Sequence, residues 1–209
     1  MLVGVNWTHP LEQGIRLIAW VWCERLLRGS PHHARAFAAA SPLWASIWQH
    51  QRFIAETYSR GSSANNHLIG EMAGLYAAAA AWPWWRESAG WRDLARGILE
   101  REATAQTYPS GINRELAFGY QLFVAEFYLL AFYEARRHGE RFADSCRDLV
   151  RRMIETIPAL ADVAGNLPRY GDADEGLAIQ LQAAQDSRLA WIHRAGAVDP
   201  RQAPVFRGL

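Results

Sequence analysis

Residues 66–81 read Asn66-His-Leu-Ile-Gly-Glu-Met-Ala-Gly-Leu-Tyr-Ala-Ala-Ala-Ala-Ala81, and this stretch decides the fold class. Alanine is the best helix former, so the composition predicts a helix over residues 66–81. On one side, Arg60-Gly-Ser-Ser-Ala64 predicts a loop, and on the other Trp82-Pro-Trp-Trp85 ends the helix. The rest of the chain continues the helical pattern.

Apolar residues recur with a helical period from Leu11 to Arg28, and Gly29-Ser-Pro31 stops this first helix. Further helices are predicted at about 33–59, broken at Ser41-Pro42, and at about 88–107, 113–138, 142–157 and 175–193. Ser41 suits a cap and Pro42 suits the first turn of a new helix. No segment is typical of a strand. Successive helices joined by short turns predict an all-α fold of antiparallel helical hairpins, as a curved or toroidal stack or as a bundle.

The length of 209 residues favours one domain. We expect a single helical domain at residues 1–195 and a loop or tail at 196–209. The net charge of +1, from 22 basic and 21 acidic residues, gives no electrostatic footprint for nucleic acid. No apolar run is long enough to span a membrane, and the first ten residues lack the pattern of a signal peptide. The sequence therefore predicts a soluble protein without a nucleic-acid or membrane partner.

Cysteine and tryptophan usage gives two further expectations. Cys23 and Cys146 are far apart and without a metal-binding pattern, so two buried free thiols are favoured over a disulfide. The chain has 10 tryptophans, which lie within helical apolar patterns. We expect most of them in the core, although flat aromatic faces can also stack on sugars.

Three polar residues, Asn65, Asn66 and His67, stand at the start of the alanine-rich helix. Free backbone N–H groups and the positive end of the helix dipole favour an anion there. An amide can hold a carboxylate, and the imidazole titrates near physiological pH. The alternative is structural, with Asn65 as the helix cap and the other two residues at the surface.

Four other residues are candidates. Glu71 lies one helical turn after His67 and can orient it or pair with a basic residue. Tyr120 can transfer a proton, or it can be a half-buried core tyrosine with one hydrogen-bond partner. Arg114 can lower the pKa of Tyr120 or bind an acidic sugar, while Arg114 and Glu115 can also be simple first-turn helix residues.

No metal or cofactor site is expected. Gly171-Asp-Ala-Asp-Glu-Gly176 lacks the full ligand pattern of an EF-hand, and Asp172 or Asp174 more simply caps the following helix. His32-His33 is too short to bind a metal by itself. A phosphate-binding glycine loop and a Gly-x-Ser-x-Gly elbow are both absent from the sequence.

Several motifs in order resemble the helical domain of heparinase II/III-type polysaccharide lyases. The motifs are Asn6-Trp7 with Glu12-Gln-Gly-Ile-Arg16, Asn65-Asn-His-Leu-Ile-Gly-Glu71, Tyr108-Pro-Ser-Gly-Ile-Asn-Arg-Glu115, Phe118-Gly-Tyr-Gln-Leu-Phe123 and Leu167-Pro-Arg-Tyr-Gly-Asp-Ala-Asp-Glu-Gly176. They span about residues 6–176. The ordered set is fairly specific, whereas any single motif is not.

The resemblance implies an incomplete (α/α) toroid, followed in the family by a β-sandwich, with the substrate cleft between them. It implies β-elimination of an acidic, uronic-acid-containing polysaccharide, such as an alginate-like or heparin-like glycan, without a cofactor. In this scheme Asn66 holds the uronate carboxylate and makes the C5 proton more acidic, with help from His67. Tyr120 protonates the leaving glycosidic oxygen as general acid. The substrate-binding candidates are Asn65, Glu71, Arg114 and Glu115. The family expectation for location is periplasmic or secreted.

The sequence departs from the family at three points. A β-rich segment does not follow residue 176, the chain starts near a middle helix of the toroid, and Gln121 stands where histidine is frequent in relatives. From the first two departures we expect a truncated member, or part of a split protein, whose second proton-transfer group lies on a separate or missing β-sandwich. One alternative is a non-catalytic glycan-binding or structural helical fragment. Another is a toroid glycoside hydrolase, which needs two carboxylates about 5–10 Å apart; its candidates are Glu71, Glu115 and Asp172.

Overall fold

The computed structural model describes residues 4, 7–160, 162, 167–172 and 176–179. These residues contain only helices and loops, with one isolated bridge between Thr107 and Asn113. The elements are α1 (Pro10–Leu27), α2 (Pro31–Ala36), α3 (Leu43–Thr57), the 3-10 turn η2 (Gly61–Ser63), α4 (Asn66–Ala81), α5 (Ser88–Gln106), α6 (Phe118–Arg137) and α7 (Asp144–Ala159). The all-α prediction is confirmed.

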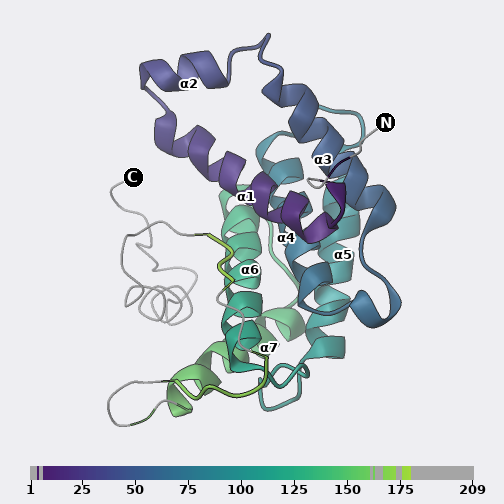
Figure 1. Ribbon diagram of the computed structural model, residues 1–209, viewed down its shortest axis with the longest axis vertical. Coiled ribbons are helices and arrows are strands. Elements are labelled where there is room, and N and C mark those ends of the chain that lie inside the picture. Colours follow the sequence, from purple (N-terminus) through teal and green to yellow (C-terminus); the bar gives the residue numbers. More distant parts are fainter. Residues whose placement is uncertain (1–3, 5–6, 161, 163–166, 173–175, 180–209) are drawn as a thin grey trace.

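Helix α4 forms the centre of the molecule. It packs against α1, α5 and α6, while α7 lies against the first part of α6 and contacts α5 as well (Figure 1). Nearly every side chain of α4 is buried, from Asn66 to Ala80. A helix that is apolar on all sides is expected to be enclosed by other elements. The alanine-rich α4 is enclosed in this way by α1, α5 and α6.

Small residues allow α1 and α4 to cross closely. Gly14 of α1 faces Gly70 and Gly74 of α4, and a Cβ atom added at Gly14 would lie 2.6 Å from the carbonyl oxygen of Gly70. Such a separation leaves no room for a side chain. The glycines therefore fix how near the two backbones approach, and with that the position of the start of α4.

The predicted bounds of α4 agree with the structure, but those of α6 and α7 were wrong. Helix α6 begins at Phe118, because residues 113–117 form a turn in which Leu116 has φ 52°. The turn is held by backbone bonds to Gln106 and within residues 113–116. Helix α7 continues through Pro158 to Ala159. Proline removes one N–H donor, which the last turn of a helix tolerates better than its middle.

The region 33–59 is broken near Ser41-Pro42 as predicted. The first piece, α2, already begins at Pro31, where the Ser30 hydroxyl accepts a bond from the His33 N–H at 3.3 Å. The second piece begins at Leu43, whose N–H donates to the Ser41 hydroxyl at 3.3 Å. Of the helix predicted at 175–193, residues 176–179 are not helical and 180–193 lie outside the described residues. The tail at 196–209 also lies outside them.

The buried apolar residues form one continuous cluster that runs through all the large helices. Most described tryptophans are buried or partly buried, as expected, while Trp84 is 64% exposed. Both cysteines are free; Cys146 is buried as predicted, but Cys23 is exposed, so that part of the prediction was wrong. No helix among the described residues has the length and apolar character needed to cross a lipid bilayer.

Candidate functional site

The start of α4 is capped from within the chain. The Asn65 side-chain oxygen accepts a hydrogen bond from the His67 N–H at 3.0 Å, which is the usual N-cap contact. The structural interpretation of Asn65 is therefore confirmed.

Asn66 pairs with Glu115 across 49 residues of sequence. The Asn66 backbone N–H donates to one oxygen of the Glu115 carboxylate at 2.9 Å, and the Asn66 side-chain Nδ2 donates to the other at 2.7 Å. Asn66 is only 3% exposed. A carboxylate thus already occupies the anion-favouring end of α4. The backbone N–H groups of Asn66 and His67 are both satisfied by these bonds.

The turn at residues 113–117 is fixed to α6 and α7 through Gln121. The Gln121 side-chain oxygen accepts from the Asn113 N–H at 2.7 Å, and its Nε2 lies 2.9 Å from the Gly111 carbonyl oxygen and 3.0 Å from that of Met153. The Asn113 side-chain oxygen in turn accepts from the Glu115 N–H at 2.8 Å. Gln121 therefore holds in place the turn whose Glu115 side chain bonds Asn66.

His67 lies beside His9, with ring centroids 4.6 Å apart and the rings nearly perpendicular. Burial lowers the pKa of His67, and the nearby His9 lowers it further. The Nδ1 atom of His67 is buried without a hydrogen-bond partner. A neutral imidazole with an unused nitrogen can accept or pass on a proton when a ligand reaches it.

Glu71 has a structural partner. It is 0% exposed, and its two oxygens accept bonds from the Ser59 N–H at 2.7 Å and the Ser59 hydroxyl at 2.6 Å. Burial raises the pKa of Glu71, which the bonds from Ser59 partly offset. This carboxylate ties the segment after α3 to α4. A contact with substrate would require Ser59 to move, and we leave Glu71 out of the proposed site.

Tyr120 lies in the first turn of α6 and is half-buried. Its hydroxyl donates to the Asp172 carboxylate at 3.1 Å, a contact that joins residues 52 apart. Backbone contacts support the same arrangement, because the Phe118 N–H donates to the Tyr170 carbonyl oxygen at 3.0 Å. Arg114 is exposed, with its guanidinium 4.5 Å from the centre of the Tyr108 ring.

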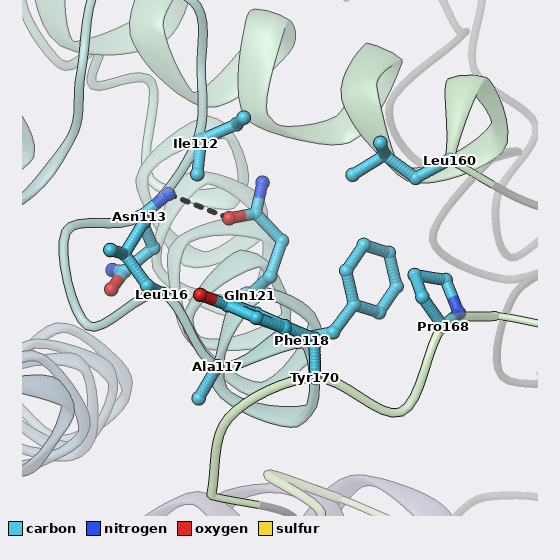
Figure 2. Close-up of a pocket in the computed structure, with 9 residues that line it drawn as sticks. All are labelled: Ile112, Asn113, Leu116, Ala117, Phe118, Gln121, Leu160, Pro168 and Tyr170. Carbon is cyan, nitrogen blue, oxygen red and sulfur yellow. Dashed lines mark hydrogen bonds between the residues drawn. The ribbon is translucent and has the colours of Figure 1, made fainter.

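A pocket of ≈ 290 Å³ opens beside these residues, between the start of α6, the end of α7 and the segment 167–170 (Figure 2). Its lining is mostly apolar; it is formed by Ile112, Asn113, Leu116, Ala117, Phe118, Gln121, Leu160, Pro168 and Tyr170. The dashed line in Figure 2 is the bond between Asn113 and Gln121. Asn66, His67 and Tyr120 are absent from the lining, so this pocket lies next to the candidate residues rather than over them.

Sequence reasoning did not identify the carboxylate partners of Asn66 and Tyr120. Glu115 was a candidate for contact with substrate, and Asp172 for a helix cap. Both contacts are long-range, and a spacing of about fifty residues carries no local signal. Within the described ranges, no three histidine, cysteine or acidic side chains group in a way that would hold a metal ion.

In the described residues, which are all-helical apart from loops, Asn66 is bonded to the turn at 113–117, His67 follows Asn66 on α4, and Tyr120 follows the turn on α6. The sequence profile of the heparinase II/III N-terminus matches residues 5–189, and the chain belongs to this family.

Relatives with known names agree with this assignment. A heparin-sulfate lyase from Pedobacter heparinus is 26% identical over 167 residues, which cover 79% of this chain and 25% of that protein. A solved heparinase III superposes with a TM-score of 0.61 at 26% identity, covering 77% of this chain and 25% of the other. Heparan sulfate lyase HepC from Pedobacter heparinus gives a TM-score of 0.60, with 77% and 25% covered. These likenesses confirm the predicted incomplete (α/α) toroid class. The chain spans about a quarter of the length of these relatives.

Proposed function

We propose that this chain provides the carboxylate-neutralising and proton-donating part of a polysaccharide lyase that cleaves an acidic glycan by β-elimination. The single observation that carries the proposal is that Asn66 is bonded to the turn at 113–117, which leads directly into the helix that carries Tyr120, in a heparinase II/III-family fold. The names of the relatives favour a heparin- or heparan sulfate-type glycan as the first substrate class to test.

In the proposed reaction, the second N–H of the Asn66 side chain donates to the uronate carboxylate. Withdrawing charge from that carboxylate makes the C5 proton easier to remove, and His67 assists. The C5–H bond breaks, a C4–C5 double bond forms and the C4–O bond breaks. Tyr120 gives its proton to the leaving oxygen as general acid. In this proposal the base that takes the C5 proton lies on a separate β-sandwich. The protein is proposed to be periplasmic or secreted.

The experiment is incubation of the chain with heparan-type, alginate-type and hyaluronan-type glycans, with and without the β-sandwich domain of a relative. The unsaturated uronate product absorbs in the ultraviolet. We expect Tyr120→Phe to lower kcat by about 10²-fold or more, because general acid catalysis contributes that much. Asn66→Ala should lower kcat by about 10²-fold as well, because it removes a donor to the charge that develops on the substrate. Tyr58→Phe is the matched control. If no uronate polymer yields absorbance even with the added domain, the enzymatic proposal is wrong.

The non-catalytic alternative has a specific observation in its favour. Glu115 already accepts from one side-chain N–H of Asn66, and Asp172 already accepts from the Tyr120 hydroxyl. Glycan binding without turnover, unchanged by Asn66→Ala and Tyr120→Phe, is the result that this alternative predicts. The hydrolase alternative is disfavoured, because Glu71 is enclosed and bonded to Ser59 rather than open to a glycosidic bond.

A further inference from the structure

We propose that Glu115 is a positioning residue, which fixes the orientation of the Asn66 side-chain amide rather than binding substrate. The inference rests on the proposed function, in which Asn66 meets the uronate carboxylate.

The hydrogen bonds determine which way the Asn66 amide points. The oxygen and nitrogen of an asparagine amide are hard to tell apart by shape, and their assignment depends on their partners. An ionised carboxylate only accepts hydrogen bonds. The Asn66 atom 2.7 Å from Glu115 must therefore be the nitrogen. One N–H of the amide is consumed, and the other N–H and the oxygen are directed away from Glu115.

The second bond makes this arrangement stiff. The Asn66 backbone N–H donates to the other Glu115 oxygen at 2.9 Å, so the carboxylate binds both the backbone and the side chain of one residue. Bonds from N–H groups to an ionised acceptor are stronger than those between neutral groups. The positive end of the α4 dipole adds a favourable interaction with the negative charge. Asn66 is 3% exposed, so few alternative rotamers are open to it.

Glu115 is itself held from behind. Its N–H donates to the Asn113 side chain at 2.8 Å, and the Asn113 N–H donates to Gln121 of α6. Leu116, the next residue, has φ 52°, a left-handed conformation that a leucine adopts only when its surroundings impose it. A continuous series of hydrogen bonds therefore links α6, which carries Tyr120, to the Asn66 amide on α4. Glu115 sets the amide in a fixed relation to the phenol.

The variant Glu115→Gln tests the proposal with almost no change in volume. Asn66 presents two N–H donors, whereas glutamine offers one acceptor oxygen and an NH2 group that opposes the second donor. Either one bond is lost or the Asn66 amide turns over. We expect kcat to fall by about 10²-fold with KM changed by less than about 3-fold, because small misplacement of a catalytic group costs that much. Glu155→Gln, in an exposed pair with Arg151 on α7, controls for the loss of a negative charge and should leave kcat unchanged.

A second measurement does not depend on activity. In the wild-type chain, the nuclear magnetic resonance signals of the Asn66 backbone N–H and of one side-chain N–H should shift together as the Glu115 carboxyl is titrated with acid. In Glu115→Gln both shifts should be absent. If wild-type protein shows no elimination with any glycan even when the β-sandwich domain is added, the proposed function fails, while the titration still decides whether Glu115 orients Asn66.

Three results overturn the positioning role. The first is an Asn66 side-chain signal that does not respond to the titration. The second is a Glu115→Gln variant whose kcat stays within about twofold of wild type. The third is a variant that raises KM with kcat unchanged, since that split is the mark of lost ground-state binding.

Discussion

At the residue scale, each of two side chains proposed to act on the substrate donates a hydrogen bond to a carboxylate. Glu115 accepts from Asn66 within a nearly closed environment, whereas Asp172 accepts from Tyr120 at the surface. The two contacts therefore have different consequences. The first orients its donor, and the second can exchange for a substrate oxygen at little cost. An acidic substrate also meets the negative charge of Asp172 as it approaches Tyr120.

We therefore predict that Asp172→Asn tightens the binding of an acidic glycan by about two- to fivefold at low ionic strength. The substitution removes a like charge from the approach to Tyr120, and interactions between exposed charges are screened over about 10 Å at 0.1 M salt. Titration calorimetry at low salt and at high salt measures the effect, which should shrink at high salt. Asp148→Asn, on the exposed face of α7, is the control. Equal affinities of Asp172→Asn and wild type at low salt would contradict this prediction.

At the scale of helices, the crossing of α1 and α4 depends on the absence of side chains. Gly14→Ala should destabilise the protein by about 1–3 kcal/mol, as expected for overpacking. Gly97→Ala is the matched control, because Gly97 lies exposed within α5 with open space around it. This control should raise stability by up to about 1 kcal/mol, since alanine favours a helix more than glycine does. Urea denaturation followed by circular dichroism measures both. A neutral Gly14→Ala would show that the two backbones separate easily.

The sequence predicts helices best where local preference and packing agree. The bounds of α4 follow from its alanine content and its cap at Asn65. The start of α6 was placed five residues early, because residues 113–117 have no local signal against a helix. Their turn is imposed by bonds to side chains and backbone from α5 and α6, chiefly Gln106 and Gln121. Tertiary contacts of this kind override propensity and are invisible in a local pattern.

The same limit applies to the candidate site. The motifs pointed to Asn66, His67 and Tyr120 through a family resemblance, and their catalytic roles stay predictions. Their partners Glu115 and Asp172 emerged only when distant segments were placed together. A buried amide has to find a hydrogen-bond partner, so some partner for Asn66 could be expected. Which of the chain's carboxylates becomes the partner of Asn66 depends on the backbone conformation of the turn at residues 113–117.

At the scale of the whole molecule, one apolar cluster joins the helices, and ionisable groups within it couple folding to pH. His50 is the most buried histidine with an altered pKa. It is 6% exposed and lies between Trp7 and Trp20, with ring centroids 4.6 Å and 4.7 Å away. Burial lowers its pKa, although the Ser46 carbonyl oxygen, 2.8 Å from Nδ1, partly opposes this. The folded state therefore favours the neutral ring.

The sign of the pH dependence follows from this preference. Burial also lowers the pKa of His67 and His138. For a histidine whose folded pKa lies below the unfolded value of about 6.5, the unfolded chain binds more protons than the folded chain once the pH falls to about that value. Stability is then fully present above pH about 6.5 and is lost on acidification. Glu71 has a raised pKa and acts with the opposite sign, because the cost of its buried charge is relieved as pH falls through the raised pKa toward the ordinary carboxyl value.

We predict that the free energy of unfolding falls between pH 7.5 and 5.5, and that His50→Gln makes this fall shallower. Glutamine can still donate to the Ser46 carbonyl oxygen, yet it has no proton to gain in this range. Each histidine that titrates fully adds up to about 1.4 kcal/mol per pH unit to the slope, and the partly exposed rings add less. Urea unfolding followed by tryptophan fluorescence at several pH values gives the slope. His32→Gln, at an exposed position, should keep the wild-type slope. If His50→Gln and wild type lose stability in parallel, the buried ring between the two tryptophans is not the group that couples folding to protons.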